Sequence, residues 1–126
     1  MPVAFTTLPS AQMNILYRVT GLAETAGNTE SSVLTTGDGQ VDITVQIYGT
    51  IGGATVTVQG TLGGTQFATL DDAFGQPMSY TALPPAQQTG GGLKPVGPAV
   101  TGLKVVVTGG TGVNLTADIY MVQKRS

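Results

Sequence analysis

The side chains that could do chemistry in this chain are carboxylates and hydroxyls, because the sequence contains no histidine and no cysteine. Without histidine the commonest general base is missing, together with every serine–histidine arrangement. Zinc sites built on histidine or cysteine are excluded in the same way. A pair of carboxylates could still hydrolyse a glycosidic bond, but no two of the 7 acidic residues have a spacing that predicts convergence. We therefore expect a protein that is not an enzyme and that holds no cofactor.

The adjacent acids Asp71 and Asp72 are the best candidate for a metal site. They lie in a predicted loop, and Ca²⁺ prefers several carboxylate and carbonyl oxygens as ligands. This loop lacks the acidic spacing of an EF-hand, so we interpret it as a turn with both carboxylates in solvent. Glycine-rich segments could cradle phosphate, but none has the spacing of a phosphate-binding loop and none precedes a predicted helix. We interpret them as hairpin turns.

The elements that must position any site are strands, because apolar and polar residues alternate along the chain. Between Val41 and Tyr48 the alternation is regular, which predicts a strand with one buried face. The segment from Ala54 to Leu70 alternates, breaks at Gly-Gly-Thr and alternates again, which predicts two antiparallel strands and their turn. Further strands are predicted at 14–20, 32–35, 78–83, 103–107 and 113–121. The side chains expected to point inward are Val56, Val58, Leu103, Val105, Val107, Val113, Leu115, Ala117, Ile119 and Met121.

These strands predict the class of the fold. No segment of ten or more residues shows a helical period, and 126 residues suffice for one domain with a two-layer core. Short strands separated by turns are typical of an all-β, single-domain β-sandwich, of either the jelly-roll or the immunoglobulin-like type. We place this domain at 13–126, after an extended N-terminal arm at 1–12.

Two segments without a strand period are candidate contact segments. The arm at 1–12 contains two prolines, and an extended arm can add a strand to the sheet edge of a neighbouring molecule. The segment 84–98 is rich in proline and glycine, which excludes a helix or a central strand. It is expected to be a projecting loop or a contact segment. The candidate interface residues are Pro2, Val3, Phe5, Leu8, Leu93 and Pro95.

The surface that the sequence predicts is polar and nearly uncharged. Charged residues make up 10% of the chain and the net charge is -2, whereas about a quarter of the residues in an ordinary domain are charged. Because charge repulsion opposes association, we interpret this composition as a surface that is covered when the protein functions. The chain has neither the basic footprint of a nucleic-acid-binding protein nor an apolar stretch that would span a membrane.

The sequence from Thr55 to Leu70 resembles a pattern in small structural proteins of tailed bacteriophage virions. In that pattern a strand ending in Gln-Gly, here Gln59–Gly60, leads through Gly-Gly-Thr to an aromatic residue, here Phe67, and then to Thr-Leu. A later Thr-Gly-Gly-Thr-Gly turn with a final apolar strand, here 108–115, completes the resemblance. The resemblance covers about half of the chain. It assigns no functional residue, because the residues shared with these proteins form turns and the core.

The resemblance implies a capsid decoration (cement) protein that binds and stabilises the outer face of a phage head. The expected partners are the major capsid protein or other virion proteins, and further copies of the chain, with a trimer favoured over a dimer. The expected location is the capsid surface of the virion after synthesis in the host cytoplasm, and the first ten residues lack the features of a secretory signal. A phage tail or fibre component is an alternative.

A carbohydrate-binding module is an alternative from a different class. Such modules bind sugars on a flat aromatic platform, and Tyr48, Tyr80 and Tyr120 fall at polar or uncertain strand positions. Tyrosines at such positions more often cover a sheet face or pack at an interface.

Overall fold

A computed structural model describes residues 2–8, 14–36, 41–83, 93–97 and 100–123. These residues form strands and no helix, so this part of the chain has no helix that could cross a membrane. The strands are β1 (Thr6–Leu8), β2 (Asn14–Leu22), β3 (Leu34–Thr35), β4 (Val41–Thr50), β5 (Thr55–Thr61), β6 (Ala68–Thr69), β7 (Ser79–Tyr80), β8 (Leu93–Pro95), β9 (Gly102–Thr108) and β10 (Asn114–Gln123).

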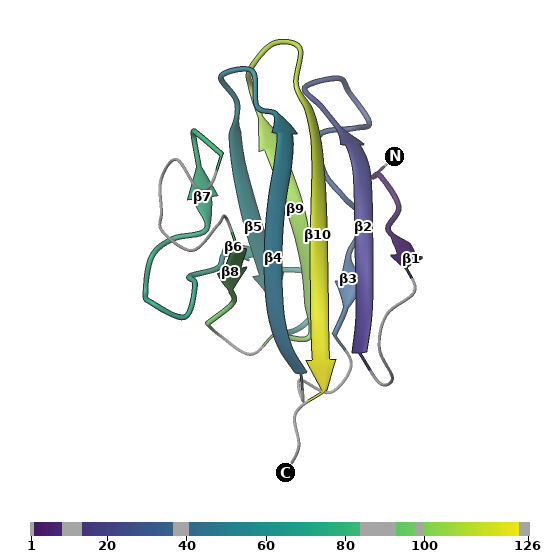
Figure 1. Ribbon diagram of the computed structural model, residues 1–126, viewed down its shortest axis with the longest axis vertical. Coiled ribbons are helices and arrows are strands. Elements are labelled where there is room, and N and C mark those ends of the chain that lie inside the picture. The colour runs from purple at the N-terminus through teal and green to yellow at the C-terminus, as the bar shows by residue number, and fades with distance from the viewer. Residues whose placement is uncertain (1, 9–13, 37–40, 84–92, 98–99, 124–126) are drawn as a thin grey trace.

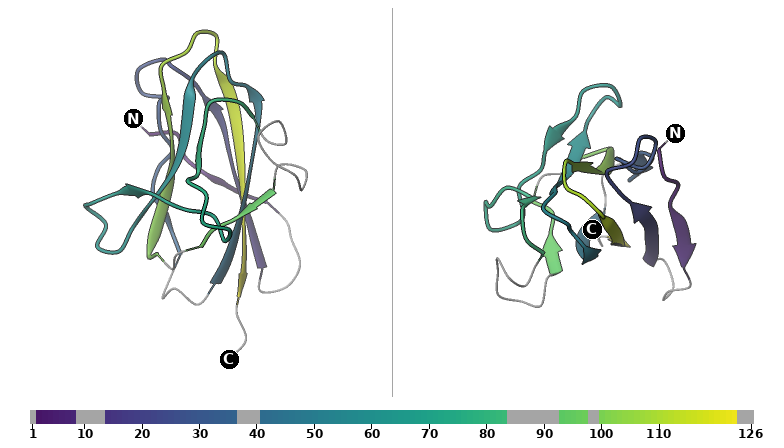
Figure 2. Two further views of the ribbon diagram at one scale, coloured as in Figure 1. Left: turned by 90° about the vertical axis from the view of Figure 1, so that its left-hand side faces the viewer. Right: turned by 90° about the horizontal axis from the view of Figure 1, so that it is seen from above.

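The strands form two antiparallel sheets that pack face to face. The first sheet has the order β1-β2-β10-β4-β8, and the second has the order β3-β9-β5-β6, with β7 also paired to β5. Figure 1 shows β4, β10 and β2 in front of β5 and β9, and Figure 2 shows the two layers from the side. The prediction of an all-β, sandwich-like fold is confirmed.

The core lies between the sheets and follows the alternation of the sequence. Because successive side chains of a strand point to opposite faces, every second residue of a long strand enters the core. All ten side chains predicted to point inward are buried, from Val56 on β5 to Met121 on β10. Burial of a side chain of this size contributes about 1.5–3 kcal/mol. The side chains of β4 that point into the core are Ile43, Val45 and Ile47.

Two glycine-rich turns were expected to be hairpins, and this is wrong. The turn after β4 carries the chain to β5 in the other sheet, and the turn after β9 carries it back to β10. The two crossings lie side by side at one end of the sandwich (Figure 1), where the N–H of Thr111 donates to the carbonyl of Gly52 at 2.9 Å. A Cβ atom added to Gly52 would lie 2.3 Å from the carbonyl oxygen of Thr111. The crossings therefore interlock through backbone contacts.

The segment from Ala54 to Leu70 does contain two antiparallel strands, with Gln59 opposite Thr69. The strand after the turn is shorter than expected, since β6 has two residues, and the strand predicted at 78–83 is reduced to β7. β6 and β7 pair with the same edge of β5, because the chain leaves that edge after β6 and returns to it at β7. The N–H of Leu70 donates to the carbonyl of Val58, and the N–H of Val58 donates to the carbonyl of Met78, each at 2.9 Å.

The described N-terminal residues pair with their own chain, so the extended N-terminal arm predicted at 1–12 is not confirmed. β1 is an edge strand that pairs with β2, placing Thr6 opposite Arg18 and Leu8 opposite Leu16. Before it, the N–H of Val3 donates to the carbonyl of Glu30 at 2.9 Å. Residues 1 and 9–12 of the predicted arm lie outside the described residues.

The proline- and glycine-rich segment also contributes to a sheet. Leu93–Pro95 form β8, which pairs with β4 at the edge of the first sheet and places Pro95 opposite Thr44. The expectation of a loop is wrong for these three residues, and a proline in an edge strand agrees with its missing N–H group. Of the rest of the predicted loop, residues 84–92 and 98 lie outside the described residues.

Candidate functional site

The outer face of the first sheet is a broad surface built from regular strands, and we call it the outer sheet face. In Figure 1 it points toward the viewer, and no other described element crosses in front of β4, β10 and β2. Its side chains are the ones that alternate with the core residues of the same strands. They include Thr6, Leu8, Leu16, Arg18, Asp42, Thr44, Gln46, Tyr48, Pro95, Thr116, Asp118, Tyr120 and Val122.

The strand register sorts this face into rows. One row runs across all five strands through Leu8, Leu16, Tyr120, Thr44 and Pro95. It is apolar except for Thr44 and the phenol hydroxyl. Two candidate interface residues, from segments far apart in the sequence, therefore share one row at opposite edges of the sheet.

The remaining candidate interface residues lie in different places. Leu93 occupies a position in the next row of the outer sheet face, opposite Gln46. Val3 and Phe5 are partly buried and pack against the core, with the Phe5 ring edge-on to Tyr17 at 6.4 Å between centroids. Pro2 is exposed. The structure thus brings half of the candidate set, Leu8, Leu93 and Pro95, to one face.

A charged network lies near the middle of the outer sheet face. The guanidinium of Arg18 donates two hydrogen bonds to the carboxylate of Asp118, with Nε–Oδ1 at 2.8 Å and Nη2–Oδ2 at 3.0 Å, and the hydroxyl of Tyr48 donates to Oδ2 at 3.1 Å. These hydrogen bonds and the charge of Asp118 raise the pKa of Arg18. Partial burial, followed by the interaction with Asp118, raises the pKa of Tyr48. Because Arg18 and Asp118 have opposite charges, the network leaves the centre of the face without net charge. The planar guanidinium, carboxylate and phenol groups lie at this centre.

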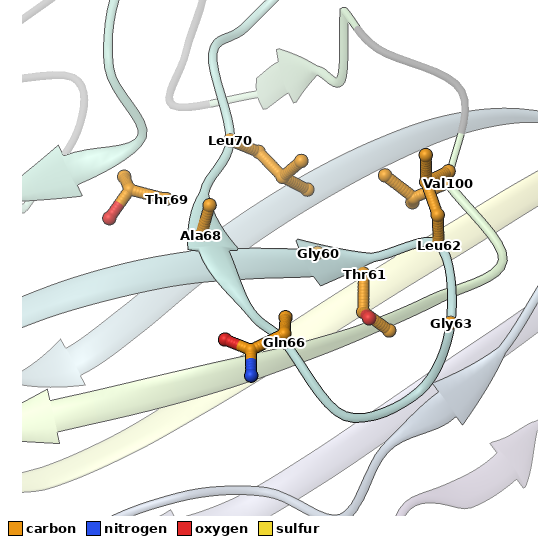
Figure 3. A pocket seen from close by; sticks show the side chains of 9 residues that line it. All are labelled: Gly60, Thr61, Leu62, Gly63, Gln66, Ala68, Thr69, Leu70 and Val100. Atoms are coloured by element: carbon orange, nitrogen blue, oxygen red, sulfur yellow. The ribbon is translucent and has the colours of Figure 1, made fainter.

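A pocket of about 460 Å³ lies at the C-terminal end of β5 (Figure 3). It is lined by Gly60, Thr61, Leu62, Gly63, Gln66, Ala68, Thr69, Leu70 and Val100, none of which is ionisable. A Cβ atom on Gly60 would lie 2.7 Å from Leu70 Cδ2 and 2.9 Å from Val100 Cγ1, so glycine at this position lets both side chains close over the strand. The chemistry of this pocket is limited to apolar contacts and neutral hydrogen bonds.

The two adjacent acids of the loop lie in different environments. Asp72 is 2% exposed, so the expectation of a solvated carboxylate is wrong for this residue, whereas Asp71 is exposed. Oδ1 of Asp72 accepts hydrogen bonds from the N–H groups of Phe74 at 2.8 Å and Gln76 at 3.0 Å. Within the described ranges, no group of three or more potential ligand residues could hold a metal ion. The carboxylate instead fixes a turn that presents the ring of Phe74, which is 77% exposed.

The three tyrosines that suggested an aromatic platform are not equivalent. Tyr48 and Tyr120 lie on the outer sheet face, but Tyr80 is 2% exposed and belongs to the core. Burial, followed by the charge of Asp72, raises the pKa of Tyr80 to about 12. A platform made of all three rings is therefore wrong. The Arg18–Asp118–Tyr48 network had no signal in the sequence, because Arg18 and Asp118 are separated by most of the chain.

Comparison of this chain with protein-family models, with curated proteins and with solved structures found no match. Its function is therefore inferred from the surface of the sandwich and from the pattern of its sequence.

Replacing Phe5 by alanine is expected to lower the free energy of unfolding by about 2 kcal/mol, because a partly buried aromatic ring is lost from the core. The same change at Leu8, on the solvent side of β1, is expected to cost less than about 0.5 kcal/mol. Urea denaturation followed by circular dichroism measures both. Equal effects at the two positions would contradict the packing of Phe5 against the core. The comparison also identifies Leu8 as the better residue for testing contacts of the N-terminal segment.

Proposed function

We propose that this chain is a non-enzymatic virion structural protein, a capsid decoration protein that binds and stabilises the outer face of a phage head. The observation that carries this proposal is a sandwich surface on which several of the described charged groups have partners within the molecule. Arg18 pairs with Asp118 at 2.8 Å, and Lys104 pairs with Glu30 at 3.1 Å. A third carboxylate, that of Glu24, accepts hydrogen bonds from the N–H groups of Gly112 and Val113 at 2.8 and 2.9 Å.

A surface of this kind suits a protein that is covered by neighbours. The centres of protein interfaces are depleted of lysine and glutamate and enriched in tyrosine and arginine. Burying a charge that already has its partner avoids the large penalty of burying an unpaired one. The outer sheet face has this composition, with Arg18 and Asp118 joined at its middle and Tyr48 and Tyr120 on either side of them along the strands. Because a particle repeats such contacts many times, each contact can be weak and no single strong binding site is needed.

The proposal includes the finer features of the fold and the partners. The sandwich is of the immunoglobulin-like or jelly-roll type, and an extended arm at 1–12 contacts neighbouring molecules. β1 supports the arm, because it is a three-residue edge strand, and an edge strand offers N–H and C=O groups that can pair with a further strand. The partners are the major capsid protein or other virion proteins, together with further copies of the chain.

The test is to locate the chain in particles of the phage that encodes it. Virions are purified, heads and tails are separated, and each fraction is analysed by quantitative mass spectrometry. The proposal predicts the chain in the head fraction at a copy number comparable with that of the major capsid protein. Detection in the tail fraction alone would replace it with a tail or fibre component. Absence from both fractions, together with binding in a glycan screen, would overturn it in favour of a carbohydrate-binding module.

A further inference from the structure

We infer that the outer sheet face is a two-fold interface between two copies of this chain. This inference deepens the proposed function, from which it takes the expectation that copies associate, by naming the surface and its symmetry. The resemblance to virion proteins favours a trimer, so the inference departs from it on a structural ground. In a two-fold dimer the same patch is used by both copies, whereas a three-fold ring needs two different patches on each copy. A single broad face with no described element over it fits the first arrangement (Figure 1).

The centre of this face carries no net charge that would repel a second copy. A patch that meets its own copy must not carry an excess of one sign near its centre, because like charges would then face each other. Here the central carboxylate, Asp118, is covered by the guanidinium of Arg18 and by the hydroxyl of Tyr48. A second copy placed across a two-fold axis therefore meets a neutral centre. Asp42, the other described acid on this side of β4, lies toward the end of the strand opposite Val122.

The size of the face is close to what a stable dimer needs. The strands β2, β10 and β4 have 9, 10 and 10 residues. With strands about 4.8 Å apart and a rise of about 3.3 Å per residue, they and the two short edge strands present a projected area of about 550 Å². Side chains make the accessible area larger than the projected one, which brings it to the lower end of the roughly 600–1,000 Å² that each partner buries in stable interfaces. The face is therefore large enough for a dimer, and we expect the dimer to dissociate reversibly on dilution.

The opposite face of the sandwich is a poorer candidate, which makes it a suitable control. In the second sheet only β5 and β9 are long, because β3, β6 and β7 have two residues each. Its outer side also carries Lys104, which pairs with Glu30 and lies 4.4 Å from the centre of the Phe67 ring. Val106, on the same side of β9, is partly buried in the same way as Tyr120 on the outer sheet face.

Sedimentation equilibrium of the full chain from micromolar to millimolar concentration tests the inference. We expect a mass that rises to twice the 12.8 kDa of the chain. The Tyr120→Glu variant places an unpaired charge in the central strand and is expected to raise the dissociation constant at least tenfold, which corresponds to about 1.4 kcal/mol. Val106→Glu adds the same charge to the opposite face and should leave the constant unchanged. A monomer at every concentration, a trimer, or equal effects of the two variants would overturn the inference.

Cross-linking provides a second readout that does not depend on how Tyr120→Glu folds. The chain contains no cysteine, so a single introduced thiol reports one position. With a short bismaleimide, Thr44→Cys on the outer sheet face should give a covalent dimer, whereas Val106→Cys should remain monomeric. Cross-linking of Val106→Cys alone would overturn the inference. These measurements use the purified chain without phage particles, so they test the dimer separately from the proposed function. A monomer would overturn the dimer even if the chain is found in phage heads. A dimer would stand even if the chain is absent from phage heads.

Discussion

Replacing Gly52 by alanine is expected to lower the free energy of unfolding by about 3 kcal/mol, whereas the same change at Gly53 is expected to cost about 1 kcal/mol. Both glycines have positive φ, +57° at Gly52 and +79° at Gly53, so alanine is strained at either position. The difference lies in the space around them. A Cβ atom at Gly53 meets nothing within 4 Å, but at Gly52 it would lie 2.3 Å from the carbonyl oxygen of Thr111.

The collision at Gly52 involves backbone and cannot be relieved by rotating a side chain. Moving Thr111 away would break the hydrogen bond from its N–H to the carbonyl of Gly52 and would separate the two crossings between the sheets. Urea denaturation of the two variants and the parent chain measures the effect. Gly53→Ala is the matched control, since it carries the conformational strain without the collision. Similar losses for both variants would show that the crossings are not interlocked as described.

Removing the hydroxyl of Tyr80 is expected to stabilise the protein and to change its response to alkaline pH. The Tyr80→Phe variant should be more stable at pH 7 by about 1 kcal/mol, because the buried hydroxyl has no hydrogen-bond partner among the described residues and leaving such a group unpaired is costly. The pKa of this hydroxyl is raised from 10.0 to about 12, mainly by burial and then by the charge of Asp72. The unfolded chain therefore loses the phenol proton first.

The sign of the pH effect follows from this order. The contribution of Tyr80 to the free energy of unfolding is fully present below pH 10. It is lost as the pH rises from 10 to about 12, because the phenol loses its proton in the unfolded chain before it does so in the folded protein. A shift of this size corresponds to a loss of about 3 kcal/mol when the group is fully ionised, and to about 1 kcal/mol by pH 11. Urea denaturation at several pH values from 8 to 11 should show a steep fall for the parent chain and a shallower one for Tyr80→Phe. Tyr120→Phe, which removes a hydroxyl from a partly exposed ring, is the control. Parallel curves for parent and Tyr80→Phe would contradict the raised pKa.

The long strands of the fold could be predicted because their pattern is local. The alternation around Ile43, Val58 and Ile119 reports which face of each strand is buried, and the structure confirms it. The partners of a strand are not local. The glycine turns near Gly52 and Gly110 have the composition of hairpin turns, yet each joins two sheets, because a turn of this kind does not determine whether the next strand pairs with the previous one or packs across from it.

The features of the outer sheet face were predictable only in part. Leu8, Leu93 and Pro95 were candidates because they are apolar residues in segments without a strand period, and the register that unites them comes from two different strand pairings. The pairing of Arg18 with Asp118 and the burial of Asp72 depend on contacts between distant segments or on the packing of a whole loop. No spacing of residue types along the chain reports either of them.

The position of β10 in the first sheet has a consequence for how the chain is made. β10 is the last of the described strands in the sequence, yet it lies between β2 and β4 and pairs with both along most of its length. While the chain emerges from the ribosome, β2 and β4 each expose an unpaired inner edge and an apolar face, which is the condition under which growing chains aggregate or recruit chaperones. The five-stranded sheet can close only after Asn114–Gln123 has been synthesised, so its folding is expected to be late and cooperative.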